Sequence, residues 1–429
     1  MKLRARSVEV DETRPLLSLL PRGADGRGPA DALAWVRTPA GAAAPGDEGL
    51  VAWGVAARIT PGPGADRFAA AECALAALDV EVVDEVGAFG SGLVGLGTFA
   101  FTDTAPGSLL VVPRVLVGRR GGRTWVTRVD PVDDGLPPVA DLPARDATLP
   151  EPARDRARFA GSSQPDLYWL EAVAAAVERI HGGGAEKVVL ARDHAVWSEQ
   201  PFDAADLARR LNARFPSCHT FVVDGFVGAT PELLLSRRGR EVFSRVLAGT
   251  TGRSTDEAED AALGAALLDS SKERAEHRYA ADSVREVLAP ITDVLHHDDT
   301  PRLLRLDNVQ HLATTFRGTL SGDATSLQIA AALHPTAAVG GTPREGAVAM
   351  IAELEGMERG RYAAPVGWTD LDGDGEWGIA LRCAELDGAR ARLFAGVGIV
   401  VDSLPEAELE ETRLKLLAMQ TALGEDPTP

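Results

Sequence analysis

Lysine is the scarcest charged residue of this chain. Arginine supplies all but four of its 44 basic residues, and the four are Lys2, Lys187, Lys272 and Lys415. Arginine stays protonated in proteins, whereas burial or a nearby cation can leave a lysine neutral and basic. A lysine retained in the interior is therefore a candidate for a task that arginine cannot perform. Chance survival of any single lysine is the alternative.

Three other absences exclude classes of protein. The cysteines, Cys73, Cys218 and Cys383, lie far apart, which excludes a disulfide framework or a cysteine zinc site and is typical of a reducing cytoplasm. No apolar run approaches the roughly 20 residues of a membrane helix, and the first residues lack a signal-peptide core, so we expect a cytoplasmic protein without a membrane partner. The net charge of −19 and the lack of a basic run argue against nucleic-acid binding.

The remaining composition is that of a globular protein, 45% hydrophobic and 25% charged over 429 residues. Residues 108–129 predict a hairpin that turns at Gly121–Gly122, and the Pro-rich residues 131–165 predict a connector. Helices alternate with strands further on, the first of them capped by Asp166. They are expected over 167–181, 202–214, 255–269, 272–296 and 405–423. This mixture of hairpins and helices favours an α+β fold over a doubly wound sheet.

Two glycine-rich motifs resemble ligand-binding loops but fail on context. GSGLVG at 90–95 matches a dinucleotide-binding pattern, yet a strand follows it and no acidic residue stands about 20 positions on. DLDGDG at 370–375 matches the start of a calcium loop, yet its twelfth position is Leu381 and strands flank it. We therefore interpret the first motif as a strand or turn and the second as a hairpin turn.

Two pairs of glutamates are the strongest candidates for a metal site. Glu273 and Glu276 open one expected helix, and Glu408 and Glu411 lie in the last one. Residues three apart share one helical face, where like charges destabilise the helix slightly unless a cation lies between them. The pairs are either two solvated faces or the two halves of a site for a hard divalent cation such as Mg²⁺. Mg²⁺ takes only one or two carboxylates directly, so the other two would act through water.

A series of motifs in one order carries a family resemblance. The motifs are EKVVLAR (186–192), ATPELLL (229–235), LAGT (247–250), SKERAEH (271–277), LHPT (333–336), YAAPVGW (362–368), LRCA (381–384) and GVGIVVDSLPEAELEETRLK (396–415). In this order and spacing the chain resembles the chorismate-utilising enzymes, which include isochorismate synthase, salicylate synthase, anthranilate synthase component I and aminodeoxychorismate synthase. The resemblance implies one large α+β domain over 1–429, with two facing sheets, helices outside and the site between. Residues 1–165 would be its variable half and residues 166–423 its motif-bearing catalytic half.

The resemblance also implies a ligand and a metal. The ligand would be chorismate, a dicarboxylate, with Mg²⁺ bridging to its ring carboxylate. Glu276 and Glu411 would then bind Mg²⁺ directly, whereas Glu273 and Glu408 would act through water. An acidic protein that binds a dianion must concentrate positive charge locally.

Further residues would hold the substrate itself. Lys415 and the backbone near Gly396 and Gly398 would assist at the ring carboxylate, although Lys415 could equally form an i,i+4 salt bridge with Glu411. Tyr362 and Arg382 would hold the enolpyruvyl carboxylate, the arginine by its planar fork. The substrate would also meet the LAGT segment, at Ala248, Gly249 and Thr250.

Three residues distinguish the reactions of the family. A lysine in place of Ala248 attacks the ring in some aminodeoxychorismate synthases, and alanine excludes that route. Lys187 is typical of members that use water, where it is the general base that activates water toward C2 of the ring. Glu232 would be the acid that protonates the departing C4 hydroxyl, since apolar neighbours can raise a carboxyl pKa. A snorkelling lysine and a surface carboxylate are the respective alternatives.

The water-using members are isochorismate synthase and salicylate synthase, and the latter also eliminates pyruvate. YAAPVGW and LHPT favour the isochorismate form, in which His334 would help to position the region around C4 or else be a packed core histidine. Ala364 where glycine is usual, and Val397 between two glycines, depart from the pattern. We thus expect a monomeric Mg²⁺-dependent isochorismate synthase without a glutaminase partner, serving menaquinone or siderophore biosynthesis. An inactive chorismate- or metal-binding regulatory relative is the alternative from another class.

Overall fold

The computed structural model of the chain describes residues 2–23, 27–39, 46–132, 142, 157–306 and 309–424. Most of the connector expected over 131–165 lies outside these ranges. The α-helices are α1 (Arg67–Ala76), α2 (Asp166–His181), α3 (Ala204–Arg214), α4 (Glu257–Asp269), α5 (Ser271–Leu288), α6 (Ser326–Leu333), α7 (Arg344–Leu354) and α8 (Pro405–Leu423). None of the helices in the described ranges is long and apolar enough to cross a membrane.

The strands of the first part of the chain are β1 (Leu3–Val10), β2 (Leu33–Arg37), β3 (Glu48–Ile59), β4 (Val80–Asp84), β5 (Val94–Thr98), β6 (Leu109–Arg120), β7 (Arg123–Pro131) and β8 (Arg158–Gly161). Those of the second part are β9 (Lys187–Trp197), β10 (His219–Val223), β11 (Phe226–Thr230), β12 (Leu233–Arg238), β13 (Glu241–Gly252), β14 (Thr292–His297), β15 (Arg302–Arg305), β16 (Val309–Leu320), β17 (Gly341–Thr342), β18 (Pro365–Asp370), β19 (Gly375–Ile379), β20 (Cys383–Asp387) and β21 (Arg390–Ile399).

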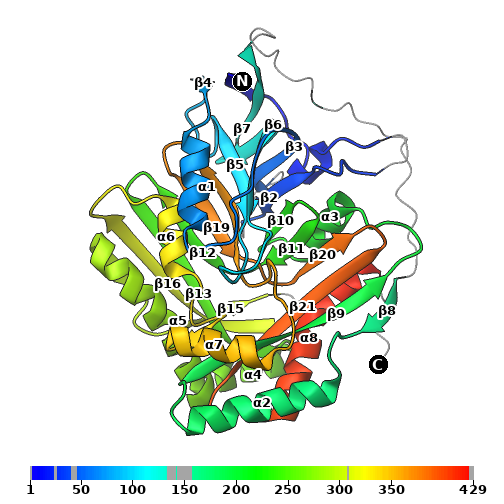
Figure 1. Cartoon of the computed structure of the whole chain (residues 1–429), viewed down its shortest axis with the longest axis vertical. Coiled ribbons are helices and arrows are strands. Elements are labelled where there is room, and N and C mark those ends of the chain that lie inside the picture. Colours follow the sequence, from blue (N-terminus) through cyan, green and yellow to red (C-terminus); the bar gives the residue numbers. More distant parts are fainter. Residues whose placement is uncertain are drawn as a thin grey trace.

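The strands form one continuous hydrogen-bonded network with two arms that meet at β6. The first arm runs in the order β3, β2, β10, β11, β20, β21 and β9. The second arm runs in the order β5, β18, β19, β12, β13 and β16. The α+β prediction is confirmed, and the two layers are joined through β6 (Figure 1).

Helices place both glutamate pairs beside this network. The helix α5 packs on β13 and β16 of the second arm, and α8 packs on β21 of the first arm and on α2. The helix α8 begins at Pro405 and ends before Gly424, which has the left-handed conformation that favours glycine at a helix end. Its predicted range is confirmed. Because α5 and α8 belong to different arms, any site between the arms can receive side chains from both helices.

Two local predictions are wrong. The helix expected over 272–296 ends at Leu288, since Pro290 lacks the N–H that a continuing helix needs, and residues 292–297 form β14 instead. Asp166 does not cap α2, because the N-cap residue is Pro165 and makes no side-chain capping bond. The Asp166 carboxylate instead pairs with Arg192 and with Arg413, 2.9 Å away on α8, so it ties three elements together.

The hairpin predictions hold. The strands β6 and β7 pair across the turn at Gly121–Gly122, and residues 370–375 form the turn between β18 and β19. GSGLVG is a turn that leads into β5.

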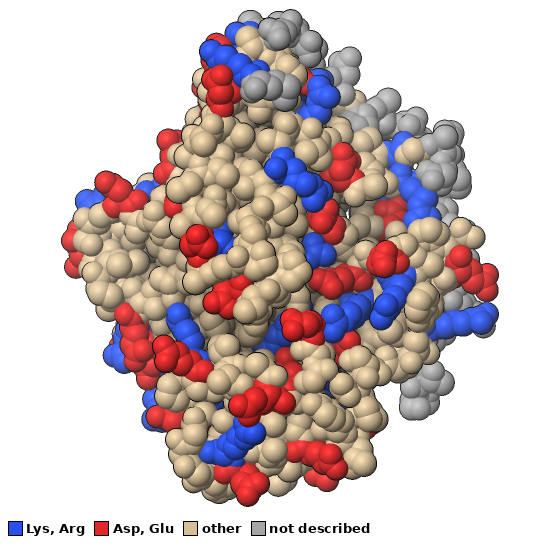
Figure 2. Space-filling view, viewed as in Figure 1, with Lys and Arg blue, Asp and Glu red and all other residues tan. Residues whose placement is uncertain are grey.

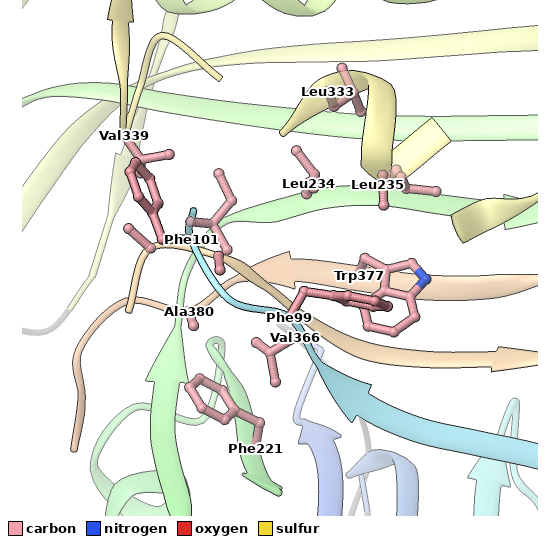
Figure 3. Close-up of a cluster of buried hydrophobic side chains, with 14 of the residues drawn as sticks. Phe99, Phe101, Phe221, Leu234, Leu235, Leu333, Val339, Val366, Trp377 and Ala380 are labelled. Carbon is pink, nitrogen blue, oxygen red and sulfur yellow. The ribbon is translucent and has the colours of Figure 1, made fainter. Parts of the chain in front are cut away.

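Buried aromatic residues fill the space between the arms. Phe221 of β10 in the first arm and Trp377 of β19 in the second arm belong to one hydrophobic cluster (Figure 3). Phe99 lies beside Trp377, with ring centroids 5.6 Å apart, and stacks on Phe68 at 3.9 Å. This core fixes the separation of the arms and leaves a cavity beyond it.

Candidate active site

The cavity lies between the two arms and gathers most of the predicted site residues. Val189 and Phe394 come from the first arm, and Leu247 and His311 come from the second. The predicted residues that line the cavity are Glu232, Ala248, Gly249, Thr250, Glu276, Tyr362, Arg382, Gly396, Gly398, Glu411 and Lys415. Lys187 and Glu273 contact members of this set, Glu408 pairs with Lys272, and His334 lies elsewhere.

Lys187 is fully buried at the start of β9, so it does not snorkel to the surface. Its Nζ lies 3.1 Å from Oε1 of Glu276, which reaches it from α5. Gly398 on the neighbouring strand makes room for this contact, because a Cβ there would lie 2.3 Å from Glu276 Oε1 and 2.9 Å from Lys187 Cε. The absence of a side chain at residue 398 therefore permits the Lys187–Glu276 pair.

Glu232 lies in the short segment between β11 and β12 and is 3% exposed. Burial raises the pKa of its carboxyl to about 8, against the smaller opposing effects of the Leu247 backbone, Lys187 and Arg245. The carboxyl is consequently protonated at neutral pH and able to donate a proton into the cavity. The alternative of a surface carboxylate is excluded.

Each of the three lysines other than Lys2 pairs with a different glutamate of the two helices. Lys187 pairs with Glu276, as described above. Lys272 of α5 donates to Glu408 of α8 at 2.9 Å, and Glu408 is only 2% exposed. Lys415 lies 2.8 Å from Glu411 on the same helix. Three of the four lysines in the sequence therefore lie in this one cluster.

Glu273 is the glutamate without a lysine of its own. Burial, followed by the neighbouring carboxylates of Glu276 and Glu411, raises its pKa to about 7. Its Oε2 accepts a hydrogen bond of 3.2 Å from the Thr250 backbone N–H. Gly249, at φ +78°, forms the bulge in β13 that turns this N–H toward Glu273. The mutual influence of three carboxylates shows that both helices contribute to one acidic cluster.

The cluster has the donor chemistry of a Mg²⁺ site. Four carboxylates offer only hard oxygen ligands, which is what Mg²⁺ prefers. Three of the four form ion pairs with lysines. Within the described ranges, no three His, Cys, Asp or Glu side chains lie close enough together to chelate an ion. The carboxylates therefore fit the metal by their donor chemistry, and three of them are paired with lysines in this structure.

Cationic and aromatic groups line the opposite side of the cavity. Arg382 donates from Nη2 to Nε2 of His311 at 2.8 Å, and the other ring nitrogen of His311 lies 3.1 Å from Thr250 Oγ1. Burial and the nearby Arg382 hold the pKa of His311 well below its usual range, so the ring is neutral and donates from Nδ1. Tyr362 stacks on Phe394 with centroids 5.1 Å apart. This side of the cavity suits a carboxylate attached to a hydrophobic body.

Lys415 makes two polar contacts, and one of them is the salt bridge that the sequence offered as the alternative. It makes the i,i+4 pair with Glu411, and its Nζ also donates to the Gly396 carbonyl at 2.9 Å. A side chain at residue 396 would crowd Tyr362, because its Cβ would lie 3.0 Å from the tyrosine hydroxyl. The segment from Gly396 to Gly398 therefore fits closely against both the helix α8 and the far wall.

The comparisons with known proteins agree with this geometry. A family model described as "Chorismate binding enzyme" matches residues 42–424. The chain belongs to this family.

The chain is 40% identical over 339 residues to the salicylate biosynthesis isochorismate synthase of Pseudomonas aeruginosa, covering 76% of this chain and 70% of that one. It is 34% identical over 341 residues to the isochorismate synthase MenF of Bacillus subtilis, covering 78% and 70% of the two chains. The structure of the menaquinone-specific isochorismate synthase MenF from Escherichia coli superposes with a TM-score of 0.77 at 25% identity and covers 98% of this chain and 94% of that one.

In this chorismate-binding protein, His334 is a core residue. It lies outside the lining of the cavity, at the end of α6, and its Nε2 contacts the Phe101 carbonyl at 2.9 Å. Its ring packs edge-on against Phe101, and burial lowers its pKa to about 3. The alternative of a packed core histidine describes it, and direct positioning of a ligand by His334 is wrong for this structure.

Two site histidines escaped prediction. His311 lies in QHLATTFRGTL, which shows only a strand pattern, and no spacing marks its contacts with Arg382 and Thr250. His277 closes the SKERAEH motif, bonds to Thr314 Oγ1 at 2.7 Å and lies 3.2 Å from the Ala248 carbonyl. Its position one residue after Glu276 in a quoted motif was the available signal. Both histidines connect strands of the second arm to the cavity wall.

Proposed function

We propose that the protein is an isochorismate synthase, an isomerase that converts chorismate to isochorismate with the help of Mg²⁺. The observation that carries this proposal is Glu232, a buried carboxyl with a pKa of about 8 in the same cavity as the Lys187–Glu276 pair. An acid that keeps its proton at neutral pH, opposite a buried amine, fits a reaction that adds water at one carbon and releases a hydroxyl as water from another.

The proposed reaction balances without another reactant. Water attacks C2 while both conjugated ring double bonds shift and the C4–O bond breaks. Lys187 accepts a proton from the attacking water, and Glu232 gives its proton to the departing hydroxyl, which leaves as water. The two residues then return to their starting protonation states by exchange with solvent.

Lys187 must be neutral when it acts as the base. In this structure its Nζ lies 3.1 Å from the Glu276 carboxylate, so release from that carboxylate is part of readying the base. Glu276 and Glu411 would hold Mg²⁺ directly and Glu273 through water, and the bound ion would supply positive charge to the ring carboxylate. Glu408, engaged by Lys272, would join α5 to α8 beside them.

The opposite wall would recognise the rest of the substrate. Arg382 is buried at the cavity and presents a guanidinium beside neutral His311, a pair suited to the enolpyruvyl carboxylate. Ala248 at the wall offers no nucleophile, so attack by water is favoured over covalent attack by the enzyme. A water-using enzyme needs no ammonia and no glutaminase. We place the protein in the cytoplasm as a monomer serving menaquinone or siderophore biosynthesis.

A product assay tests the proposal. Purified protein is incubated with chorismate in the presence of Mg²⁺ or of EDTA, and isochorismate, salicylate and pyruvate are quantified. Isochorismate formed with Mg²⁺ and without pyruvate is the expected result. Salicylate with an equivalent of pyruvate would identify a salicylate synthase instead, and bound but unchanged chorismate would identify an inactive regulatory relative.

A further inference from the structure

The strand β9, which carries Lys187, is paired with a strand along only one of its two edges. That edge pairs with β21 over residues 188–197. The opposite edge pairs with β17 at Lys187 and Val188 and with β8 at residues 195–197. Between these two ends, no strand in the described part of the chain pairs with the opposite edge, although Ala191 there is buried. Buried backbone groups need hydrogen-bond partners, so other groups must fill this gap.

Two charged side chains that follow α7 fill the gap. Glu355 accepts a hydrogen bond of 2.8 Å at Oε1 from the Ala191 N–H. Arg359 donates from Nη2 to the Val189 carbonyl at 2.7 Å and from Nη1 to the Val339 carbonyl at 2.8 Å. Its Nε lies 2.9 Å from Oε2 of Glu355, so the carboxylate holds the guanidinium in place. The ion pair therefore takes the place of a neighbouring strand.

The orientation of Arg359 is fixed from several sides. Its side chain is buried together with that of Glu355, and its guanidinium lies over the ring of Phe101, 4.2 Å from the centroid. A planar guanidinium held over a ring can direct several N–H groups at once, whereas a lysine ammonium lacks this rigid fork. The backbone carbonyl of Arg359 also accepts a hydrogen bond of 3.0 Å from the Tyr362 N–H. Arg359 thus holds neighbouring segments through both its side chain and its backbone.

The segments that Arg359 holds share one property. Val189, Val339 and Tyr362 all line the catalytic cavity, whereas Arg359 itself does not. Lys187 lies only two residues before Val189 on β9. Stability alone is a weak explanation for such a pair, since apolar residues of similar volume often replace a buried ion pair without loss of stability. Its geometry, which joins three parts of the cavity wall, is the stronger explanation.

We propose that Arg359, oriented by Glu355, is a positioning residue of the catalytic cavity. Its fork sets the distance between β9, which carries Lys187, and the segment that contains Val339. The effect on the rate rests on the proposed function, whereas the ordering of these segments does not. A displacement of about 1 Å between a reacting group and its substrate can lower a rate by about 10²-fold.

The expected effect falls on kcat more than on KM. The two cations that we assign to the substrate carboxylates, Arg382 and Lys415, are held by other residues than Arg359. Their grip on the substrate should therefore survive the loss of the fork, while the distance from Lys187 to the ring changes.

The double variant Glu355→Gln/Arg359→Met tests the proposal, because it removes both buried charges and leaves neither without a partner. We expect a folded protein whose kcat is lower by at least about tenfold and whose KM changes by less than about threefold. Arg359→Lys keeps the charge and loses the fork, so its kcat should fall as well. Asp298→Asn/Arg302→Met, at another i,i+4 pair whose arginine side chain is 79% exposed, is the matched control.

Hydrogen exchange of the full chain, followed by mass spectrometry, provides a readout that does not depend on turnover. Peptides that cover residues 186–192 and 336–342 should exchange faster in the double variant and in Arg359→Lys than in the wild type. Peptides of β6 should exchange at the wild-type rate. Thermal unfolding verifies that each variant is folded, and Arg359→Lys supplies both measurements if the double variant does not fold.

Three outcomes would overturn the proposal. A wild-type kcat in the folded double variant would show that the pair is only structural, and a wild-type kcat in Arg359→Lys would show that only its charge matters. Unchanged hydrogen exchange in both peptides would show that the fork orders neither segment. If the wild type forms no isochorismate, the proposed function fails, and the exchange measurement alone still decides whether Arg359 positions the wall.

Discussion

Glu232 combines burial with a place in the wall of the cavity, and its protonation sets a limit on activity. Its pKa of about 8 means that the carboxyl keeps its proton below that pH and loses it above. The rate should therefore fall as the pH rises through about 8. Because this pKa is higher in the folded protein than its ordinary value of 4.5, the protonated carboxyl stabilises the fold. That contribution to the free energy of unfolding is complete below pH 4.5 and is lost as the pH rises through about 8.

Replacing Glu232 by glutamine tests that role. An amide cannot give up a proton as an acid, so Glu232→Gln should lower the turnover rate by about 10²–10⁴ at pH 7. The residual activity should lack the decline near pH 8. Glu241→Gln, at an exposed position of β13, is the control. A variant with the wild-type rate and the wild-type pH profile would remove Glu232 from the mechanism.

Activity should depend equally on Lys187, which we assign as the base, whereas Glu232 is the acid. Lys187→Ala removes the amine that we assign to proton abstraction, and it should also lower turnover by about 10²–10⁴. Lys2→Ala removes the only lysine outside the glutamate cluster and should have no effect. Steady-state rates with chorismate measure both. Full activity in Lys187→Ala would show that this buried lysine is only structural.

Lys187 and Glu232 also show which site residues could be predicted from the sequence. The scarcity of lysine singled out Lys187 and Lys415, and apolar neighbours suggested a raised pKa for Glu232. The ion pairs could not be predicted in the same way, since Lys272 and Glu408 stand 136 positions apart and meet only through the packing of α5 and α8. His311 was missed because its partners, Thr250 and Arg382, are distant from it in the sequence.

At the scale of elements, the close approach of β21 to α5 leads to a prediction about Gly398. In Gly398→Ala the new Cβ would lie 2.3 Å from Glu276 Oε1, so the carboxylate must move away from Lys187. We expect weaker Mg²⁺ binding and a loss of activity of at least about tenfold. Gly322→Ala, where no atom lies within 4 Å of the added Cβ, is the matched control.

Calorimetry with Mg²⁺ and steady-state assays measure the two effects of Gly398→Ala. Wild-type values for both would mean that Glu276 can shift without consequence and is not a ligand.

The ends of helices and strands could be predicted from the sequence where a proline or glycine determines them. Pro405 and Gly424 fix the ends of α8, and Gly121–Gly122 fixes the hairpin of β6 and β7. The end of α5 was misjudged because its helical periodicity continues past Leu288, although Pro290 was visible. The joining of both arms through β6 depends on long-range pairing that no local pattern encodes.

At the scale of the whole molecule, charge is distributed unevenly. Acidic and basic side chains are interspersed on the face seen in Figure 2. Three of the four lysines gather instead at the catalytic cluster, where Lys187 is fully buried and Lys272 and Lys415 are partly buried. Since a dianion is repelled by the net charge of −19, binding must depend on these local cations rather than on long-range attraction.

The same charge balance predicts how Mg²⁺ affects stability. Three lysines already offset three of the four glutamates, so the protein should fold without the metal, and Mg²⁺ should then displace lysines from Glu276 and Glu411. A cation that binds only the folded state stabilises it by about 2.7 kcal/mol at 100 times its dissociation constant, so thermal unfolding should shift upward as Mg²⁺ is added. The shift should be lost in Glu276→Gln and in Glu411→Gln and kept in Glu257→Gln, an exposed acid of α4. An equal shift in all four proteins would mean that the ion binds elsewhere, because only a site built on these two glutamates makes the stabilisation depend on them.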